Sequence, residues 1–289
     1  MSQLNLLAPA KINLTLEILG KRPDNFHDLT SIIVSVNLND EIKIAESSKL
    51  EILCTNMLIE KEFNLAYLAA KKLKDQYKIS KGAKITISKN IPVAAGLGGG
   101  SSDAAMTLIG LNEFWELGLK VDQLIPIASS LGSDITFFLH NGTAMVQGKG
   151  EFIRTLPLAN IKYAVILSPN ISIKNKTEYM FSNVSSHHYT KGALTRKLEA
   201  RIRRHGDIPS ELLFNVFDQI SIDLFPELNL IRQTFSDVWN KEIHLCGAGP
   251  SLFTLVESKE TATALSLLLN KKTGFKAYVV KPTKSIEWK

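Results

Sequence analysis

A glycine-rich stretch between a strand pattern and a helix pattern constrains this chain more than any other feature. Residues 92–105 run Pro-Val-Ala-Ala-Gly-Leu-Gly-Gly-Gly-Ser-Ser-Asp-Ala-Ala, with four glycines in five positions. Before this stretch, residues 84–88 alternate around two isoleucines, which predicts a strand. After it, apolar residues recur at helical spacing up to Trp115, and Gly118 ends that pattern. The sequence therefore predicts a strand, a glycine loop and a helix in direct succession.

A loop of this kind has a chemical use. Glycine adopts backbone conformations closed to other residues and lets a ligand approach the backbone N–H groups. The first N–H groups of a helix have no partner and carry the positive end of its dipole, so anions bind there. We expect a polyphosphate at this loop, with Ser101 or Ser102 as the N-cap of the helix. A flexible connection without a ligand is the alternative.

The loop fits neither of two common nucleotide motifs. No Gly-Lys-Ser or Gly-Lys-Thr follows the glycines, so it is not a P-loop. The dinucleotide fingerprint that begins at Gly96 and Gly98 ends on Ser101 in place of the third glycine.

Composition indicates a globular protein of two domains. The chain has 289 residues, of which 45% are hydrophobic and 21% charged. Unbroken apolar runs, such as residues 163–167, are much shorter than the roughly 18 residues that span a bilayer. Residues 4–10 lack a basic leader and are too short for a signal peptide, so we expect a first strand and a cytoplasmic location without a membrane partner.

The cysteines and the net charge limit the kinds of ligand and partner that this chain could bind. Cys54 and Cys246 form no metal-binding pattern, and we expect two reduced, packed thiols. The net charge of +6 suits an anionic substrate or a nucleic acid. Basic residues gather in 191–204, where leucines and an isoleucine recur at helical spacing. We interpret this segment as an amphipathic helix with a solvated basic face, and an RNA-binding surface is the alternative.

Three further stretches occur in a fixed order around the loop. Residues 8–14 run Ala-Pro-Ala-Lys-Ile-Asn-Leu, residues 131–138 run Leu-Gly-Ser-Asp-Ile-Thr-Phe-Phe, and residues 246–251 run Cys-Gly-Ala-Gly-Pro-Ser. This ordered set resembles the GHMP small-molecule kinases. Lys-Arg-Pro-Asp-Asn-Phe-His at 21–27 resembles the branch that phosphorylates a cytidine diphosphate-linked methylerythritol in the non-mevalonate isoprenoid pathway, and so do the motifs at 142–144 and 148–151.

The resemblance covers nearly the whole chain outside residues 183–240 and implies a fold. It implies an α+β protein with the two-domain GHMP kinase fold, a ribosomal-protein-S5-domain-2-like domain at 1–157 and a ferredoxin-like domain at 158–289. The site would lie between the two domains. It also implies a monomer or homodimer that acts on a small molecule, with no nucleic-acid partner.

The resemblance assigns the reacting groups. Asp134 matches the catalytic base that takes the proton from the substrate's 2-hydroxyl as that oxygen attacks the γ-phosphate of ATP. Lys11 matches its partner lysine. The ATP-binding residues would be Pro92, Val93, Ala94, Ala95, Gly96, Leu97, Gly98, Gly99, Gly100, Ser101 and Ser102. Mg²⁺ should accompany ATP, with Ser101, Ser102 and Asp103 as candidate ligands and none assigned.

The resemblance also assigns the substrate side. Phe26 would stack on the cytosine, His27 would hydrogen-bond its edge, and Phe181 would cover the opposite face. The other substrate-binding residues would be Asn13, Thr177, Gly247 and Gly249, with both glycines near the substrate pyrophosphate. Asn25 stands where the family has glycine, and asparagine tolerates a left-handed turn. The alternatives are another GHMP kinase, of homoserine or mevalonate type, and a non-catalytic RNA-binding protein.

Overall fold

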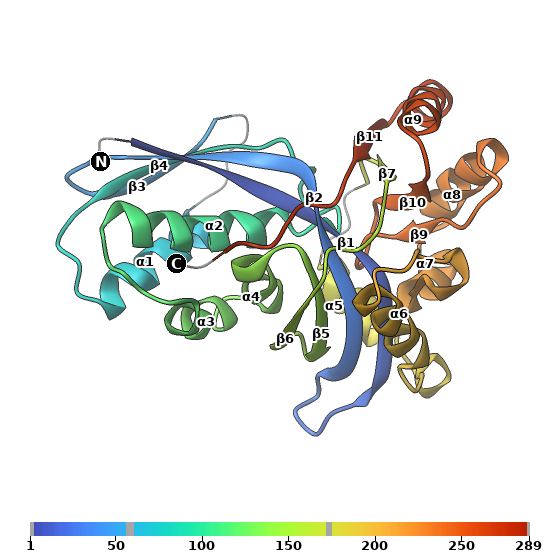
Figure 1. Ribbon diagram of the computed structural model, residues 1–289, viewed down its shortest axis with the longest axis horizontal. Coiled ribbons are helices and arrows are strands. Elements are labelled where there is room, and N and C mark those ends of the chain that lie inside the picture. Colours follow the sequence, from blue (N-terminus) through green and yellow to red (C-terminus); the bar gives the residue numbers. More distant parts are fainter. Residues whose placement is uncertain (1–2, 56–60, 172–174, 288–289) are drawn as a thin grey trace.

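The computed structural model describes residues 3–55, 61–171 and 175–287 (Figure 1). Its strands are β1 Gln3–Lys21, β2 His27–Ala45, β3 Leu50–Cys54, β4 Ala83–Ser88, β5 Thr143–Gly148, β6 Phe152–Leu156, β7 Tyr163–Ser168, β8 Phe214–Asn215, β9 His244–Leu245, β10 Leu252–Val256 and β11 Lys276–Val280. Its α-helices are α1 Leu65–Gln76, α2 Gly99–Phe114, α3 Val121–Ser129, α4 Ser133–His140, α5 Lys176–Ser182, α6 Ala193–Arg203, α7 Val216–Leu224, α8 Pro226–Val238 and α9 Lys259–Thr273. Short 3-10 helices are η1 Lys61–Phe63, η2 Ser186–His188 and η3 Ser210–Leu212.

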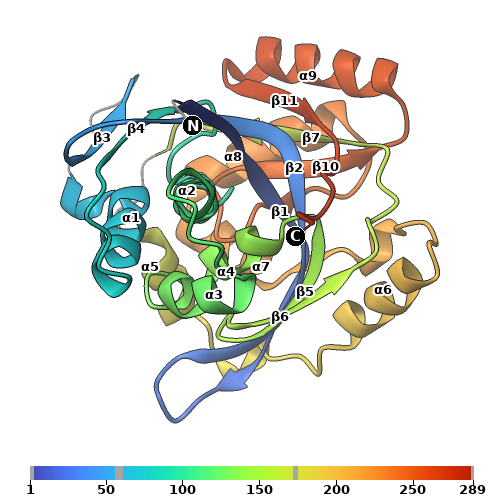
Figure 2. The same ribbon diagram turned by 60° about the vertical axis from the view of Figure 1, so that its left-hand side comes forward.

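The described strands form two sheets. The larger has the order β3-β4-β2-β1-β8, and β5 joins it by pairing with β2 and β6. The smaller has the order β11-β7-β10-β9. Helices α1, α2, α3 and α4 pack beside the first sheet, whereas α7, α8 and α9 lie beside the second (Figures 1 and 2). The predicted α+β class is confirmed.

Strands β1 and β2 form a long antiparallel hairpin that projects from the body of the molecule (Figure 1). The sequence patterns at 11–19, 29–38 and 41–45 predict shorter strands, but each of the two strands runs for 19 residues without a break. Register shifts after Pro9, Asn13 and Ile18 make the pairing irregular, and residues 8–18 of β1 are all buried, with no alternation of buried and exposed positions. In the connecting turn, Asn25 has the left-handed φ of 67° expected for it.

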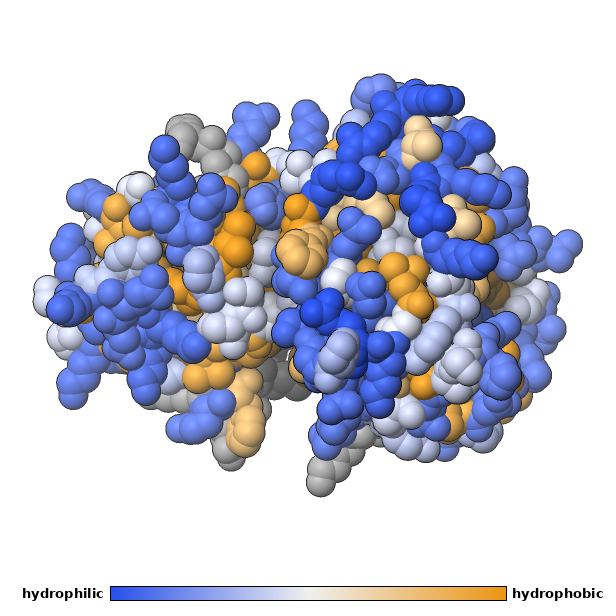
Figure 3. Space-filling model, turned by 90° about the horizontal axis from the view of Figure 1, so that it is seen from below, coloured by the Kyte–Doolittle hydropathy of each residue, from blue (hydrophilic) through white to orange (hydrophobic). Residues whose placement is uncertain are grey.

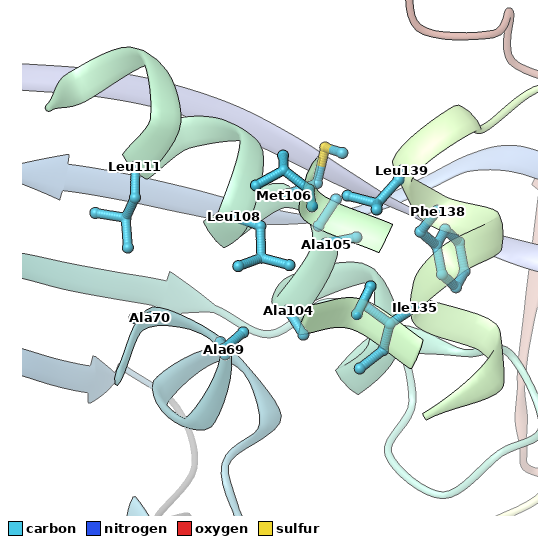
Figure 4. Packing of buried hydrophobic residues seen from close by; sticks show 14 of the residues in the cluster. Ala69, Ala70, Ala104, Ala105, Met106, Leu108, Leu111, Ile135, Phe138 and Leu139 are labelled. Carbon is cyan, nitrogen blue, oxygen red and sulfur yellow. The ribbon is translucent and has the colours of Figure 1, made fainter. Parts of the chain in front are cut away.

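Helix α2 forms the centre of the core beneath the first sheet. Its residues Ala104 and Leu108 pack between Ala69 of α1 and Ile135 of α4 (Figure 4). Gly110 lets the helix lie against the sheet, since a Cβ there would come within 2.3 Å of Leu6 Cδ1. This packing fixes the direction in which the N-terminus of α2 points.

The expected serine cap of α2 is wrong. The N-cap is Gly98, with a φ of 74° and no side-chain hydrogen bond to the first turn. Ser101 and Ser102 lie inside the helix, one and two residues after its second glycine. The glycine loop therefore continues directly into the helix, and the first N–H groups have no side-chain cap.

The second half of the chain returns to the first sheet, both within its length and after β11. Strand β8 pairs in parallel with β1, at Thr15 and Leu16. Beyond β11, the chain runs back along the first half (Figure 1), where Pro282 bridges Val36 and Ser285 bridges Asn141. The boundary at 157/158 stays a prediction.

The structure agrees with several simpler expectations from the sequence. Cys54 and Cys246 are free thiols, as predicted. The basic segment forms α6, with Leu198 and Ile202 buried and Arg203 paired to Glu199 on the outer side. None of the described helices combines the length and apolar character that a membrane span requires. The face in Figure 3 is mainly hydrophilic, with hydrophobic residues in separate patches.

Candidate active site

A cleft of about 1090 Å³ collects most of the predicted site residues. It is lined by the β1–β2 hairpin, the glycine loop, the start of α4, helix α5 and the turn after β9. The predicted residues on its wall are Lys11, Asn13, Phe26, His27, Ala94, Gly96, Gly98, Ser101, Asp134, Thr177, Phe181 and Gly247. Residues from both sides of the predicted domain boundary therefore meet in one cavity.

Backbone hydrogen bonds fix the glycine loop from two sides. Leu97 O accepts from Lys11 N of β1 at 2.9 Å, and Ala95 O accepts from Ser251 N at 3.2 Å. Gly98 and Ser101 then reach the cleft at the uncapped N-terminus of α2. Free N–H groups, a helix dipole and a concave wall make this end of the cleft suited to an anion.

Close packing explains why glycine is required in the loop. A Cβ on Gly96 would lie 1.8 Å from Cys246 O, and Gly96 has a φ of 81°. A Cβ on Gly98 would lie 2.8 Å from the Phe138 ring of α4. The loop thus contacts the C-terminal glycine turn and α4 at distances that exclude any side chain.

Lys11 is buried and held by a chain of hydrogen bonds within the hairpin. Its Nζ donates to Asn13 Oδ1 at 2.7 Å, and Asn13 Nδ2 donates to Ser31 Oγ at 2.9 Å. Ser31 Oγ donates in turn to Thr15 O at 2.5 Å. Two polar side chains, Asn13 of β1 and Ser31 of β2, and one backbone carbonyl therefore fix the position of this ammonium group in the wall of the cleft.

Asp134 presents a carboxylate to that ammonium. It is the second residue of α4, where the N-terminal end of a helix stabilises negative charge. Its Oδ2 lies 3.8 Å from Lys11 Nζ, and its side chain stays 44% exposed. A carboxylate held beside a fixed cation and open to the cleft can align a hydroxyl group and accept its proton.

His27 forms the inner wall of the other end of the cleft. Its ring stacks on Phe181, with centroids 5.6 Å apart and an interplanar angle of 24°. Burial, followed by the nearby Lys21, lowers the pKa of His27 below its ordinary value. Its Nε2 is buried without a hydrogen-bond partner among the described residues. A neutral imidazole with an unused nitrogen can read the edge of a flat polar ring.

Phe26 lies at the rim of the same end. Its side chain is 58% exposed, and Lys149 Nζ lies 4.9 Å from its ring centroid. Phe181 packs edge-on against Phe217, with centroids 5.0 Å apart, so it is fixed from behind. Two aromatic rings and an imidazole thus gather where the resemblance predicts a nucleobase.

Not every predicted residue lines the cleft. Pro92, Val93, Ala95, Leu97, Gly99, Gly100, Ser102 and Gly249 are absent from its wall. The sequence also missed one buried wall residue, Lys176, whose Nζ donates to Ala94 O at 2.6 Å and to Gly249 O. Its position next to the predicted substrate-binding residue Thr177 was the one sequence feature that could have drawn attention to it.

Among the candidate metal ligands, Ser101 alone lines the cleft. Asp103 turns into the interior, where its Oδ2 accepts from Lys89 Nζ at 2.6 Å, and Lys89 also contacts Asp40. Burial raises the pKa of Asp103 to about 7 against the attraction of Lys89, and Asp40 adds to the rise. No group of three or more His, Cys, Asp or Glu side chains in the described ranges could hold a metal ion.

Comparisons with known proteins agree with this geometry. The family model of the GHMP kinases N terminal domain matches residues 64–142. A 4-diphosphocytidyl-2-C-methyl-D-erythritol kinase from Dehalococcoides mccartyi is 38% identical over 96% of this chain and 97% of its own length. One from Bacillus mycoides is 37% identical over 86% of both chains.

Solved structures give the same result. A crystal structure of 4-(cytidine 5'-diphospho)-2C-methyl-D-erythritol kinase superposes with a TM-score of 0.82 and 27% identity, over 96% of this chain and 98% of that one. A homoserine kinase from Cytophaga hutchinsonii shares the fold, with a TM-score of 0.75 and 18% identity over 99% of this chain and 96% of that one.

Fold, cleft and family model together define a GHMP kinase, as the sequence motifs predicted. Within the GHMP kinases, the sequence identity of 38% over 96% of this chain and 97% of the Dehalococcoides mccartyi kinase decides the family. The chain belongs to the 4-diphosphocytidyl-2-C-methyl-D-erythritol kinase family.

Proposed function

We propose that this protein transfers the γ-phosphate of ATP to the 2-hydroxyl of 4-diphosphocytidyl-2-C-methyl-D-erythritol, giving the 2-phosphate and ADP. One observation carries the proposal: a single cleft joins the Lys11–Asp134 pair to the His27–Phe181 stack. The first pair suits transfer to an alcohol, and the second suits recognition of a base. Family membership points to the same reaction.

In the transfer step, the substrate oxygen attacks the γ-phosphorus while the bond to the ADP oxygen breaks. Asp134 aligns the hydroxyl group and accepts its proton. Lys11, held by Asn13, places its ammonium group beside Asp134 and the reacting oxygens. Positioning and charge stabilisation supply most of the catalysis in reactions of this type.

The glycine loop and the start of α2 are proposed to bind the ATP phosphates. The uncapped N–H groups after Gly98 and the hydroxyl of Ser101 face this end of the cleft. The Ser102 hydroxyl is buried without a partner among the described residues and does not line the cleft. Ser101, the candidate ligand that lines the cleft, would hold Mg²⁺ with the phosphates, and the bound ion would supply charge neutralisation at the β- and γ-oxygens.

The aromatic end is proposed to bind the cytosine. His27 is neutral because its pKa is lowered, so one ring nitrogen donates and the other accepts. Phe26 and Phe181 offer flat apolar surface, for which alanine substitution typically costs about 1–3 kcal/mol per stacked base. A substrate without a nucleobase leaves these three side chains without a role.

Steady-state kinetics with three acceptors tests the proposal. With ATP and Mg²⁺, the purified protein should turn over the cytidyl substrate and leave mevalonate and homoserine almost unreacted. Strong turnover of mevalonate or homoserine, with none of the cytidyl compound, would reject this assignment in favour of another GHMP kinase. Phe181→Ala should raise the KM for the cytidyl substrate and leave the KM for ATP unchanged.

A further inference from the structure

Lys176 is a buried cation in the cleft that the proposed reaction has not used. It is the first residue of α5, lines the cleft and is 8% exposed. Its Nζ donates to Ala94 O at 2.6 Å and to Gly249 O. One side chain therefore joins two backbone segments that lie far apart in the sequence.

Those two segments are the glycine loop and the C-terminal glycine turn, residues 246–251. Their backbones touch: the Cβ position of Gly96 is 1.8 Å from Cys246 O and 2.8 Å from Gly249 O. Carbonyl oxygens of both segments consequently face the same small space. An ammonium group there offsets their partial negative charges and satisfies them with charge-assisted hydrogen bonds.

The surroundings of Lys176 are otherwise unfavourable for a cation. Burial, followed by repulsion from Lys11, lowers its pKa to about 8. Two carbonyl oxygens are its polar partners in the described part of the chain, and no carboxylate pairs with it. Since Lys11 and Lys176 line one cleft, a bound polyanion would stabilise both charges.

We propose that Lys176 is a positioning residue for the phosphate-binding loop. Its ammonium fastens the loop to the C-terminal glycine turn and strengthens the attraction for the ATP phosphates. This inference rests on the kinase function proposed above. Lys176 thereby joins the phosphate-binding loop to the C-terminal glycine turn, and no motif in the sequence indicates this link.

The test compares Lys176→Met with Lys176→Arg. Methionine keeps an unbranched stem and removes the donors and the charge, so the KM for ATP should rise about tenfold to a hundredfold. The KM for the cytidyl substrate should not change. Arginine keeps charge and donors and should restore most of the ATP affinity. Lys162→Met serves as the control, because it removes an exposed cation outside the cleft and should leave both KM values unchanged.

Several outcomes would overturn the inference. A Lys176→Met variant with the wild-type KM for ATP would remove the role, and so would an equal rise in both KM values. If Lys176→Met does not fold, Lys176→Gln, which keeps an N–H donor without charge, is measured in the same way. Wild-type KM for ATP in Lys176→Gln would likewise reject the contribution of charge.

A second measurement separates this inference from the proposed function. Calorimetric titration with ADP and Mg²⁺ reports phosphate binding without any acceptor. If the wild type fails to phosphorylate the cytidyl substrate, the proposed function falls. Weaker ADP binding in Lys176→Met would still support the role of Lys176, and equal ADP binding would contradict it.

Discussion

Lys11 Nζ and Asp134 Oδ2 lie 3.8 Å apart, where β1 passes the first turn of α4. This separation is longer than the roughly 2.7–2.9 Å of a charge-assisted hydrogen bond. The lysine is instead bonded to Asn13 at 2.7 Å. The carboxylate is therefore held near a cation while its oxygens stay available to a third group.

Asp134→Asn should lower kcat by about 10²–10⁴-fold, since the amide cannot accept the proton of the attacking hydroxyl. Asparagine has nearly the same shape, so the KM values for ATP and the cytidyl substrate should change little. Steady-state kinetics measures both. Near-native kcat in this variant would show that another group, or none, accepts the proton.

Gly96→Ala should damage the phosphate site, because the new Cβ would meet Cys246 O at 1.8 Å. We expect the KM for ATP to rise more than about tenfold as the loop shifts. Gly118→Ala is the matched control: it has a φ of 63°, and a Cβ there meets nothing within 4 Å. It carries only the cost of a left-handed alanine, about 1–2 kcal/mol. Equal KM values for ATP in the two variants would contradict the close approach.

Acid should destabilise the fold through His27. Its pKa in the folded protein lies below the ordinary value of 6.5, so the unfolded chain takes up the proton first as pH falls. The stabilisation is fully present above pH 6.5 and is lost as pH falls through the lower, folded pKa. Urea unfolding of wild type and His27→Gln at several pH values measures this.

The difference between the two proteins is the informative quantity. His140, whose pKa burial also lowers, is present in both and cancels. The free energy of unfolding should depend less on pH below 6.5 in His27→Gln than in wild type. Parallel curves would show that His27 has the same pKa in both states.

Lys89→Met should be strongly destabilising, because it leaves the Asp40 and Asp103 carboxylates buried without their cation. Breaking a buried ion pair from one side typically costs about 3–5 kcal/mol. Urea unfolding should show this loss, and Asp103→Asn added to Lys89→Met should recover part of it. Lys162→Met, at an exposed position, should stay within about 0.5 kcal/mol of wild type.

The sequence predicted the succession of strand, glycine loop and helix at one end of the cleft for a physical reason. Strand β4, the loop and α2 are consecutive, and local chemistry alone placed glycine at a helix N-terminus. The serine cap failed because capping propensity does not register that Gly98 already begins the helix in a left-handed conformation. Gly98 takes this conformation where it packs against the Phe138 ring, which a Cβ would approach to 2.8 Å.

Local sequence patterns could not predict contacts between segments that lie far apart in the chain. No local pattern indicates the role of Lys176, since its carbonyl partners Ala94 and Gly249 lie 82 and 73 positions away. Helix α7 also escaped notice, although Val216, Phe217 and Ile220 are buried. The sequence patterns divided β1 and β2 into shorter strands, because local alternation shows neither the continuous burial of residues 8–18 nor the register shifts in the pairing.

The return of the chain to its first half has a consequence for folding during synthesis. Ser35 Oγ lies 2.6 Å from Thr283 Oγ1, a partner that is 248 positions further along the chain. Many multi-domain proteins complete an N-terminal unit while the ribosome is still translating the rest. Here Val36 of β2, and Asn141 just before β5, meet their partners Pro282 and Ser285 only after β11 has been made. The contacts of the first half of the chain are therefore complete only when the residues after β11 have been synthesised.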